Sequence, residues 1–216
     1  MKLKYVLLGL IMVFGFASAA QATVIDFESL KNPDPYVPWV GAWVGNYYEE
    51  DGFQLATNGP TGFAALGMQN SSFSGSTALF VYDWGETTVL SRTDGSLFQL
   101  NSIDLCELNA GQSYNPPFAV TFYGLLANGG MVQQTFTLDG VFGPQTFFFD
   151  ADFTDLVSVS WQQAPETNPV NYADPYQFDN IRLNEGYQAA VPEPATMLLF
   201  ASGLLGLAGA YKKRKN

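Results

Sequence analysis

The stretch Val157-Ser158-Val159-Ser160-Trp161 alternates between apolar and small polar side chains. A repeat of two residues places the valines and the tryptophan on one face of an extended chain and the serines on the other, which is typical of a half-buried β-strand. Residues 118–126, FAVTFYGLL, show a similar alternation. No stretch between residues 23 and 190 shows the 3.6-residue apolar repeat of an amphipathic helix.

Further short segments rich in Phe, Val, Thr and Tyr recur along the chain, separated by turn signals such as Asp-Gly and Asn-Gly-Pro. These segments are 23–30, 52–57, 77–83, 87–92, 97–108, 131–138, 145–150 and 176–183. About ten strands at this spacing predict an all-β fold, an antiparallel two-sheet sandwich of jelly-roll type. Residues 31–51 and 162–176 carry prolines and aromatic rings instead of an alternation, so we expect loops there.

The N-terminus has the features of an export signal. Lys2 and Lys4 precede an apolar stretch over residues 5–17, and Ala20-Gln21-Ala22 has the small-x-small pattern of a cleavage site. We expect signal peptidase of the general secretory machinery to cut between Ala22 and Thr23. An N-terminal anchor that is not cleaved is the alternative.

The C-terminus combines three features in order. Pro192-Glu193-Pro194 is followed by a charge-free apolar run over residues 195–211 and then by the basic cluster Lys212-Lys213-Arg214-Lys215. The apolar run is at the short limit of a helix that spans a bilayer. Because positive flanks stay cytoplasmic, we expect everything before Val191 to lie on the far side of that membrane.

In order and spacing, residues 191–216 resemble the PEP-CTERM sorting signal, found on exported proteins of Gram-negative bacteria that make exopolysaccharide. The resemblance implies recognition by exosortase, a membrane cysteine transpeptidase, with cleavage near the tripeptide and release or transfer of the mature protein. An ordinary membrane anchor is the alternative, but it does not account for two prolines that bracket one carboxylate. The segments IDFE (25–28), GFQL (52–55) and FDNIRL (178–183) are also similar to ectodomains of this family, which resemble jelly-roll carbohydrate-binding modules.

The predicted organisation follows from the two ends. It consists of a signal peptide (1–22), a β-sandwich ectodomain (23–185), a linker (186–190) and a sorting signal with a transmembrane helix (191–216). The expected precursor is anchored in the inner membrane with its ectodomain outside the cytoplasm. The expected mature form lies at the cell surface or is extracellular.

Charge is distributed unevenly along the chain. Between residues 23 and 190 only Lys31, Arg92 and Arg182 are basic, against nineteen acidic residues, so this part carries a net charge of −16. Such a domain repels nucleic acids, and nucleic-acid binding is excluded. The surplus of carboxylates is compatible with calcium, which takes oxygen ligands, although solubility alone accounts for most of these acids.

A calcium site is predicted where the first and last strands of the sandwich meet. The candidate ligands are Glu28, with Asp26 as the alternative on the first strand, and Asp179 on the last strand. The competing interpretation is that these acids lie on the outer face or cap a turn. The segment DADFTD (150–155) lacks the central Gly and the distal Glu of an EF-hand loop, so a solvated acidic turn is favoured there.

Residue composition also restricts catalysis. The chain has no histidine and a single cysteine, Cys106, which excludes catalytic triads with histidine, zinc sites with His or Cys ligands, and an internal disulfide. Cys106 lies in an expected strand and is predicted to be a buried, inert thiol. Glu49 and Glu50 are adjacent, so on a strand they face opposite ways and do not form the carboxylate pair of a glycosidase. We therefore expect a protein that is not an enzyme.

Aromatic rings in the two loop stretches suggest sugar binding, because their faces stack on pyranose rings. The candidates are Trp39, Trp43, Tyr47, Tyr48, Tyr172 and Tyr176. Packing in the core is the competing role for each ring. The function expected is that of a surface or biofilm-matrix protein that binds the cell's own exopolysaccharide. The first alternative is a self-associating, calcium-dependent adhesin without sugar recognition, and the second is a carbohydrate-active enzyme.

Overall fold

A computed structural model describes residues 22–33, 42–82, 85–108, 110, 117–163 and 176–184. The strands are β1 (Thr23–Ile25), β2 (Ala42–Gly45), β3 (Tyr47–Glu50), β4 (Phe53–Thr57), β5 (Phe63–Ala65), β6 (Leu79–Val81), β7 (Thr87–Arg92), β8 (Leu100–Glu107), β9 (Phe118–Leu126), β10 (Met131–Leu138), β11 (Gln145–Phe148), β12 (Leu156–Gln162) and β13 (Tyr176–Leu183). One short 3-10 helix, η1 (Glu28–Leu30), follows β1.

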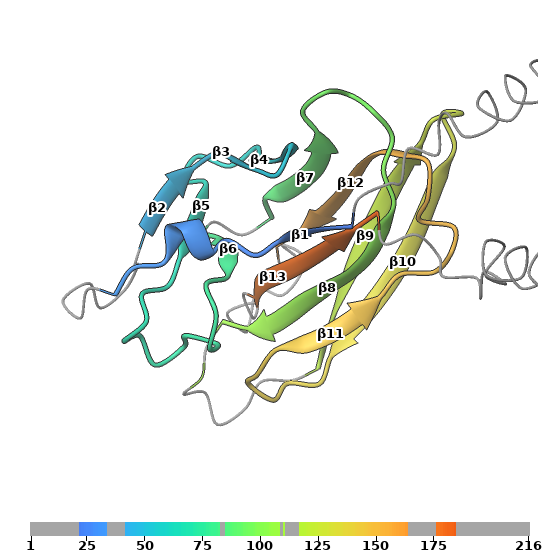
Figure 1. Ribbon diagram of the computed structural model, residues 1–216. Coiled ribbons are helices and arrows are strands. Elements are labelled where there is room, and N and C mark those ends of the chain that lie inside the picture. The colour runs from blue at the N-terminus through green and yellow to red at the C-terminus, as the bar shows by residue number, and fades with distance from the viewer. Residues whose placement is uncertain are drawn as a thin grey trace, which may run out of the picture. The chain divides into compact units, whose positions relative to one another are not determined.

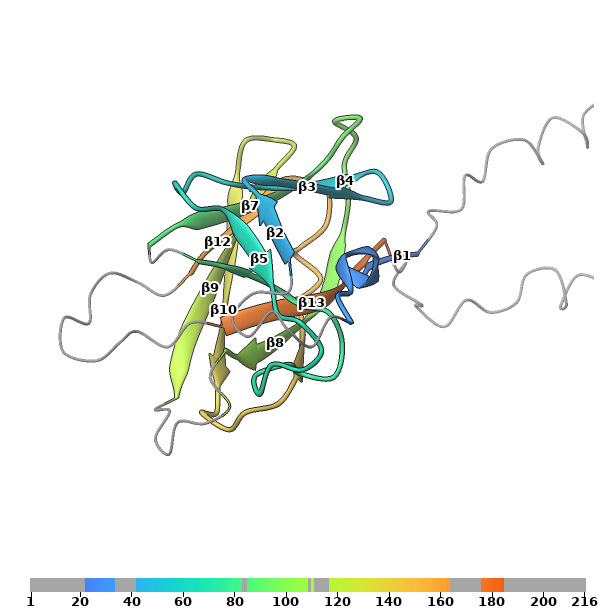
Figure 2. The same ribbon diagram turned by 90° about the vertical axis from the view of Figure 1, so that its left-hand side faces the viewer.

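The strands form two antiparallel sheets that face each other (Figures 1 and 2). The seven-stranded sheet has the order β11-β8-β13-β6-β5-β2, with β1 paired to β13. The six-stranded sheet has the order β10-β9-β12-β7-β4-β3. The predicted all-β, two-sheet sandwich is therefore confirmed.

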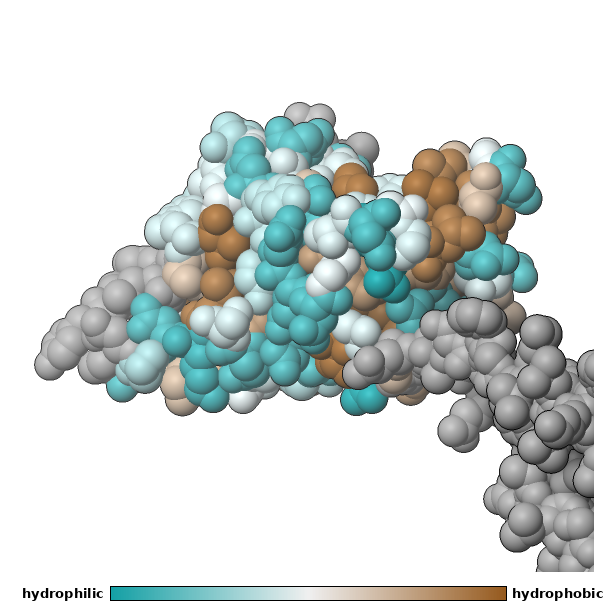
Figure 3. All heavy atoms as spheres, turned by 45° about the horizontal axis from the view of Figure 1, so that its top comes forward, coloured by the Kyte–Doolittle hydropathy of each residue, from teal (hydrophilic) through white to brown (hydrophobic). Residues whose placement is uncertain are grey.

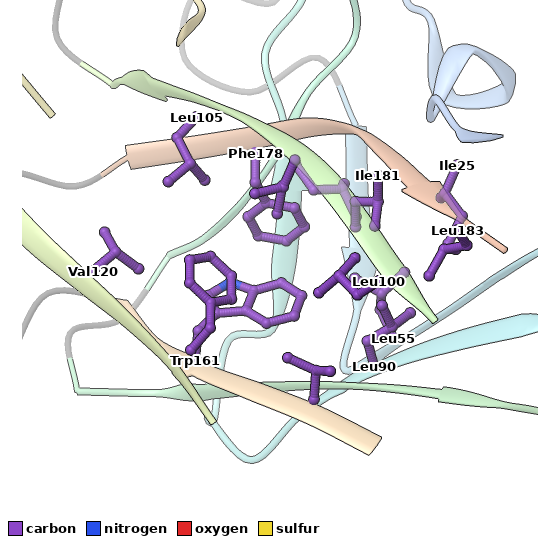
Figure 4. Close-up of a cluster of buried hydrophobic side chains, with 14 of the residues drawn as sticks. Ile25, Leu55, Leu90, Leu100, Leu105, Val120, Trp161, Phe178, Ile181 and Leu183 are labelled. Carbon is purple, nitrogen blue, oxygen red and sulfur yellow. The ribbon is translucent and has the colours of Figure 1, made fainter. Parts of the chain in front are cut away.

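The core lies between the sheets and is built from the apolar faces of alternating strands. Val159 and Trp161 are buried on β12, as their spacing predicts. Val157, which was expected on the same face, is exposed instead, because the register of β12 with β9 shifts between Leu156 and Ser158. The Trp161 ring meets the edge of Phe178 from the opposite sheet at a centroid distance of 5.3 Å. Figure 4 shows these two residues with Val120 and Leu105 in the layer between the sheets. Burial of such large side chains is the main term that stabilises the sandwich.

The first expected strand is shorter than predicted. It ends at Ile25, because Phe27 adopts a left-handed conformation (φ 54°) and Glu28–Leu30 then form η1. This turn points the buried Phe27 ring into the core, against Phe178 at 5.9 Å. The prediction that Glu28 lies on a strand is wrong, because β1 ends at Ile25, three residues earlier.

Three strands of the structure were not predicted from the sequence. β2 and β3 lie inside the stretch 31–51, which was expected to be a loop, and β5 was not expected. All three residues of β5 are buried, so this strand has no polar face and no alternation to detect. The second half of the stretch 31–51 is thus part of the sandwich.

The two ends of the sandwich differ in what they carry. Thr23 pairs with Leu183, so the first and last strands of the sandwich meet at one end (Figure 1). At this end, which we call the exit end, the amide of Asn184 donates to the carbonyl of Gln99 at 3.0 Å. The opposite end, which we call the far end, contains the start of β13 at Tyr176.

No helix in the described ranges is long and apolar enough to cross a membrane. The run predicted to span the bilayer, residues 195–211, lies outside these ranges.

Candidate functional site

A layer of small and apolar side chains supports the outer face of the seven-stranded sheet near its β2 edge. Trp43 of β2 pairs with Ala64 of β5, which in turn pairs with Phe80 of β6. Ala64 and Phe80 are buried and pack with Leu66 in a cluster separate from the main core. Trp43 lies on the same face at the edge of this row and is 57% exposed.

A second exposed ring lies against Trp43. Tyr82 directly follows β6 and, at a spacing of two from Phe80, lies on the same outer face. Its amide donates to the carbonyl of Gly62 at 3.2 Å, which continues the strand pairing. The centroids of the Trp43 and Tyr82 rings are 5.1 Å apart with planes inclined by 54°, and Tyr82 is 52% exposed. We call these two residues the aromatic pair.

Tyr82 was not among the predicted site residues. It belongs to the strand-like segment 77–83, and a period of two from Phe80 was the only signal that placed it on an outer face. Its contact with Trp43 joins residues 39 positions apart, which no local pattern reveals.

Tyr47 is exposed as well, but it belongs to the other sheet. The chain passes from β2 to β3 through Gly45 (φ 85°) and Asn46, whose side-chain amide donates to the carbonyl of Gly59 at 2.8 Å. The Tyr47 hydroxyl donates to Oε1 of Glu49 at 2.7 Å, and this bond raises the pKa of the phenol. Trp43 and Tyr47 therefore lie on consecutive strands of different sheets.

Two predicted sugar-binding residues are core residues. Tyr48 is buried against Phe27, with its hydroxyl 3.0 Å from Oε2 of Glu50. Tyr176 is fully buried, and its hydroxyl donates to the carbonyl of Gln162 at 2.9 Å. Neither ring has a face available to a ligand, so the prediction is corrected for these two residues.

Several predicted residues lie outside the described ranges. These are the sugar-binding candidates Trp39 and Tyr172, the cleavage-site residue Ala20, and the sorting-signal residues Pro192, Glu193, Pro194, Lys212, Lys213, Arg214 and Lys215. Thr23, the residue expected to follow signal-peptide cleavage, is the first residue of β1.

Asp179 is a buried carboxylate on the outer face of β13. It lies under the connection between β5 and β6, where Ser76 Oγ donates to its Oδ2. The Asn180 amide donates to its Oδ1 at 2.7 Å. Burial, together with the carboxylates of Asp104 and Glu28, raises the pKa of Asp179 to about 7, although the hydrogen bonds from Ser76 and Asn180 act in the opposite direction.

Glu28 approaches the same connection from η1. The Thr77 amide donates to Glu28 Oε1 at 2.8 Å, and Lys31 forms an ion pair with Oε2 at 3.1 Å. The hydrogen bond from the Thr77 amide is the main cause of a lowered pKa for Glu28. The two predicted calcium ligands thus contact neighbouring residues, Ser76 and Thr77.

Within the described ranges no group of three or more His, Cys, Asp or Glu residues is arranged to hold a metal ion. A cation at Glu28 and Asp179 would need additional oxygen ligands from the backbone or from water. Calcium binding at these two residues stays a prediction.

Two other expectations concern reactive groups. Glu49 is exposed on the outer face of β3, whereas Glu50 is half-buried and accepts a bond from the Phe27 amide at 3.2 Å. The adjacent acids therefore face opposite ways, as predicted. Cys106 is buried, and burial raises the pKa of its thiol to about 11, which keeps it protonated and inert.

The C-terminal segment is similar to a known signal. Residues 190–215 match the model of the PEP-CTERM protein-sorting motif, which confirms the resemblance seen in the sequence. The motif implies an exported protein that is anchored through its C-terminus and processed by exosortase. No curated protein sequence matches the chain.

The sandwich is similar to carbohydrate-binding modules of known structure. A family 29 module is 17% identical with a TM-score of 0.40, over 75% of this chain and 86% of that one. A family 11 module from Clostridium thermocellum, in complex with a beta-1,3-1,4-mixed-linked tetrasaccharide, is 16% identical with a TM-score of 0.35, over 77% and 96%. At these values the likeness concerns the fold alone.

Proposed function

We propose that this protein is a non-catalytic glycan-binding protein of the cell surface or matrix, delivered there by exosortase. The sorting motif at residues 190–215 supports the delivery. The aromatic pair supports the binding and is the observation on which the glycan assignment rests, because its two large rings are more than half exposed, in contact with each other and next to a row of buried residues on the same face.

An inclined pair of rings suits a carbohydrate. The apolar C–H faces of a pyranose stack on aromatic rings, while polar groups nearby bond its hydroxyls. Exposed Trp and Tyr that pack on each other are held in place, so less side-chain entropy is lost when a ligand binds. The expected ligand is the exopolysaccharide of the producing cell.

The absence of an enzymatic site is part of the proposal. The whole chain lacks histidine, and the adjacent acids Glu49 and Glu50 are separated onto two faces of a strand. A carboxylate pair in a common cleft, as in glycosidases, is not formed by these two residues.

Binding is tested with the mature domain, residues 23–190, on a glycan array and on immobilised exopolysaccharide. Trp43→Ala and Tyr82→Ala should each weaken retention about tenfold, equivalent to about 1.4 kcal/mol. Tyr123→Ala is the matched control, because Tyr123 is 42% exposed on the outer face of the other sheet. Equal retention of the wild type, Trp43→Ala and Tyr82→Ala would show that the aromatic pair does not bind the glycan.

The alternative is a calcium-dependent, self-associating adhesin. The surplus of acidic residues and the proximity of Glu28 and Asp179 to one connection support it. Failure of the domain to bind any glycan, together with oligomers that form only when calcium is present, would favour this alternative.

A further inference from the structure

Exposed apolar side chains gather on the six-stranded sheet at its exit end. Leu125 and Met131 are direct partners across β9 and β10, and both point to the outer face. Leu125 also pairs with Ser158, the neighbour of Val157 at an irregularity in β12. Met131 is 68%, Val157 41% and Leu125 38% exposed. We call these three residues the exit-end patch.

The patch belongs to the end of the sandwich where the chain enters and leaves. Phe98 pairs with Leu156 next to Val157, and the Asn184 amide bonds to Gln99. A further exposed ring, Phe148, lies at the end of β11 opposite Ser102. Figure 3 shows a group of hydrophobic residues on the right-hand side of the sandwich, the side on which the β9–β10 hairpin lies in Figure 1.

The length of chain that follows β13 limits how far this end can be from a membrane. Ten residues, 185–194, separate Asn184 from the apolar run 195–211. Even fully extended, ten residues span at most about 36 Å. While the apolar run lies in the bilayer, Asn184 therefore stays within about 36 Å of the lipid surface.

We propose that in the anchored precursor the exit-end patch rests on the surface of the lipid bilayer. The tether keeps the patch at a high effective concentration near the lipid, which lowers the affinity that contact with the surface requires. Exposed apolar patches on soluble domains mark such contact sites. This inference does not depend on glycan binding.

Acidic residues at the exit end determine which lipid headgroups the exit-end patch can contact. Asp150, Asp152 and Asp155 are exposed in the connection between β11 and β12, at the same end. They repel anionic headgroups, so contact should be strongest on a zwitterionic surface and should weaken as anionic lipid is added.

With the exit-end patch on the bilayer, the aromatic pair would face away from the membrane. Leu79 pairs with Phe178 close to the start of β13, and Tyr82 lies beyond Leu79 in the direction of the far end. Docking of the exit-end patch would therefore leave Trp43 and Tyr82 open to the outside.

The test uses the full chain reconstituted in phosphatidylcholine vesicles that contain nitroxide-labelled lipid. Cys106→Ala removes the native thiol, and a bimane label is placed at Met131→Cys or at Val141→Cys. The two positions are matched, since Met131 is 68% and Val141 66% exposed, but Val141 lies at the far end. There, the neighbouring Gly140 amide bonds to Glu107, which pairs with Tyr176. We expect quenching at position 131 to be several-fold stronger than at position 141.

A second variant separates contact from mere proximity. Leu125→Ser with Val157→Ser should lower quenching at position 131 toward the level of position 141, whereas Tyr47→Ser, on the edge strand β3, should leave it unchanged. Equal quenching at the two label positions, or quenching at position 131 that survives loss of Leu125 and Val157, would overturn the proposal.

Discussion

Asp179 is a residue whose acid–base chemistry the fold changes strongly. Its carboxyl is buried under the connection from β5 to β6 and faces Asp104 and Glu28. The folded state therefore favours the protonated form, with a pKa of about 7 in place of the ordinary 3.8.

This shift makes stability depend on pH. Between pH 4 and pH 7 the folded state holds a proton on Asp179 that the unfolded chain has lost, so the free energy of unfolding falls as pH rises. At 1.36 kcal/mol per pKa unit, the upper limit of this loss is about 4 kcal/mol. Asp179→Asn should remove the loss while its side-chain oxygen still accepts from the Asn180 amide. Urea unfolding from pH 4 to pH 8 with a chelator present measures the effect, and parallel curves for the wild type and the variant would contradict it.

Calcium bound at Asp179 should raise the free energy of unfolding, because a cation stabilises the ionised carboxylate in the folded state. At a calcium concentration one hundred times the dissociation constant, the folded state would gain about 2.7 kcal/mol. The melting temperature would then rise by roughly 5–10 °C. Asp179→Asn should abolish the rise, whereas Asp150→Asn, in the exposed acidic turn, should retain it. Equal melting temperatures with calcium and with chelator would contradict calcium binding at Glu28 and Asp179.

Among the elements, β13 organises the seven-stranded sheet. It pairs with β1, β6 and β8, and its register to β8 shifts between Asp179 and Arg182. Asn180 forms this bulge with φ 47°, and its side-chain amide donates to Asp104 Oδ2 at 2.9 Å. The bulge inserts one residue, so that Phe178 and Ile181 both point into the core.

Substitutions at Asn180 separate the backbone contribution from the hydrogen bond. Asn180→Ala should lower the free energy of unfolding by about 1–3 kcal/mol, because alanine is strained in the left-handed region. Asn180→Gly adopts that region freely and should cost less, although it also loses the bond to Asp104. Equal losses for the two variants in urea unfolding would show that the hydrogen bond, not the backbone, is decisive.

The bounds of some strands could be predicted from the sequence, whereas other strands were missed. β7, β9, β10 and β13 have the predicted bounds, because each combines β-branched or aromatic residues with clear turn signals on both sides. β5 was missed because both of its faces are buried. The break after Ile25 was missed because a left-handed Phe27 depends on the tertiary contact of its ring with Phe178.

The candidate site was only partly predictable. Trp43 and Tyr47 are exposed, whereas Tyr48 and Tyr176 are not, although all four lie in similar Tyr-rich and Trp-rich sequence. Their burial is set by the face of the strand that each residue occupies, since Tyr47 and Tyr48 are neighbours on β3, and Trp43 and Tyr176 belong to the same sheet. The partnership of Trp43 with Tyr82 depends on the pairing of β2, β5 and β6, which composition does not encode.

At the scale of the whole molecule, the topology fits delivery and display. The pairing of Thr23 with Leu183 brings the predicted signal-peptide junction and the start of the linker to one end of the sandwich. The sorting motif at residues 190–215 follows shortly after that end. The part from residue 23 to residue 190 has a net charge of −16, which favours its solubility.

The most direct test of this account is the mass and location of the protein in cells with and without exosortase. With exosortase, the mature protein should lack the signal peptide and the residues that follow the cleavage near Pro192-Glu193-Pro194, and it should be found outside the cell. Deletion of exosortase, or substitution of the tripeptide by alanines, should leave a heavier precursor in the membrane fraction. Mature protein with its usual C-terminus outside cells that lack exosortase would contradict the account.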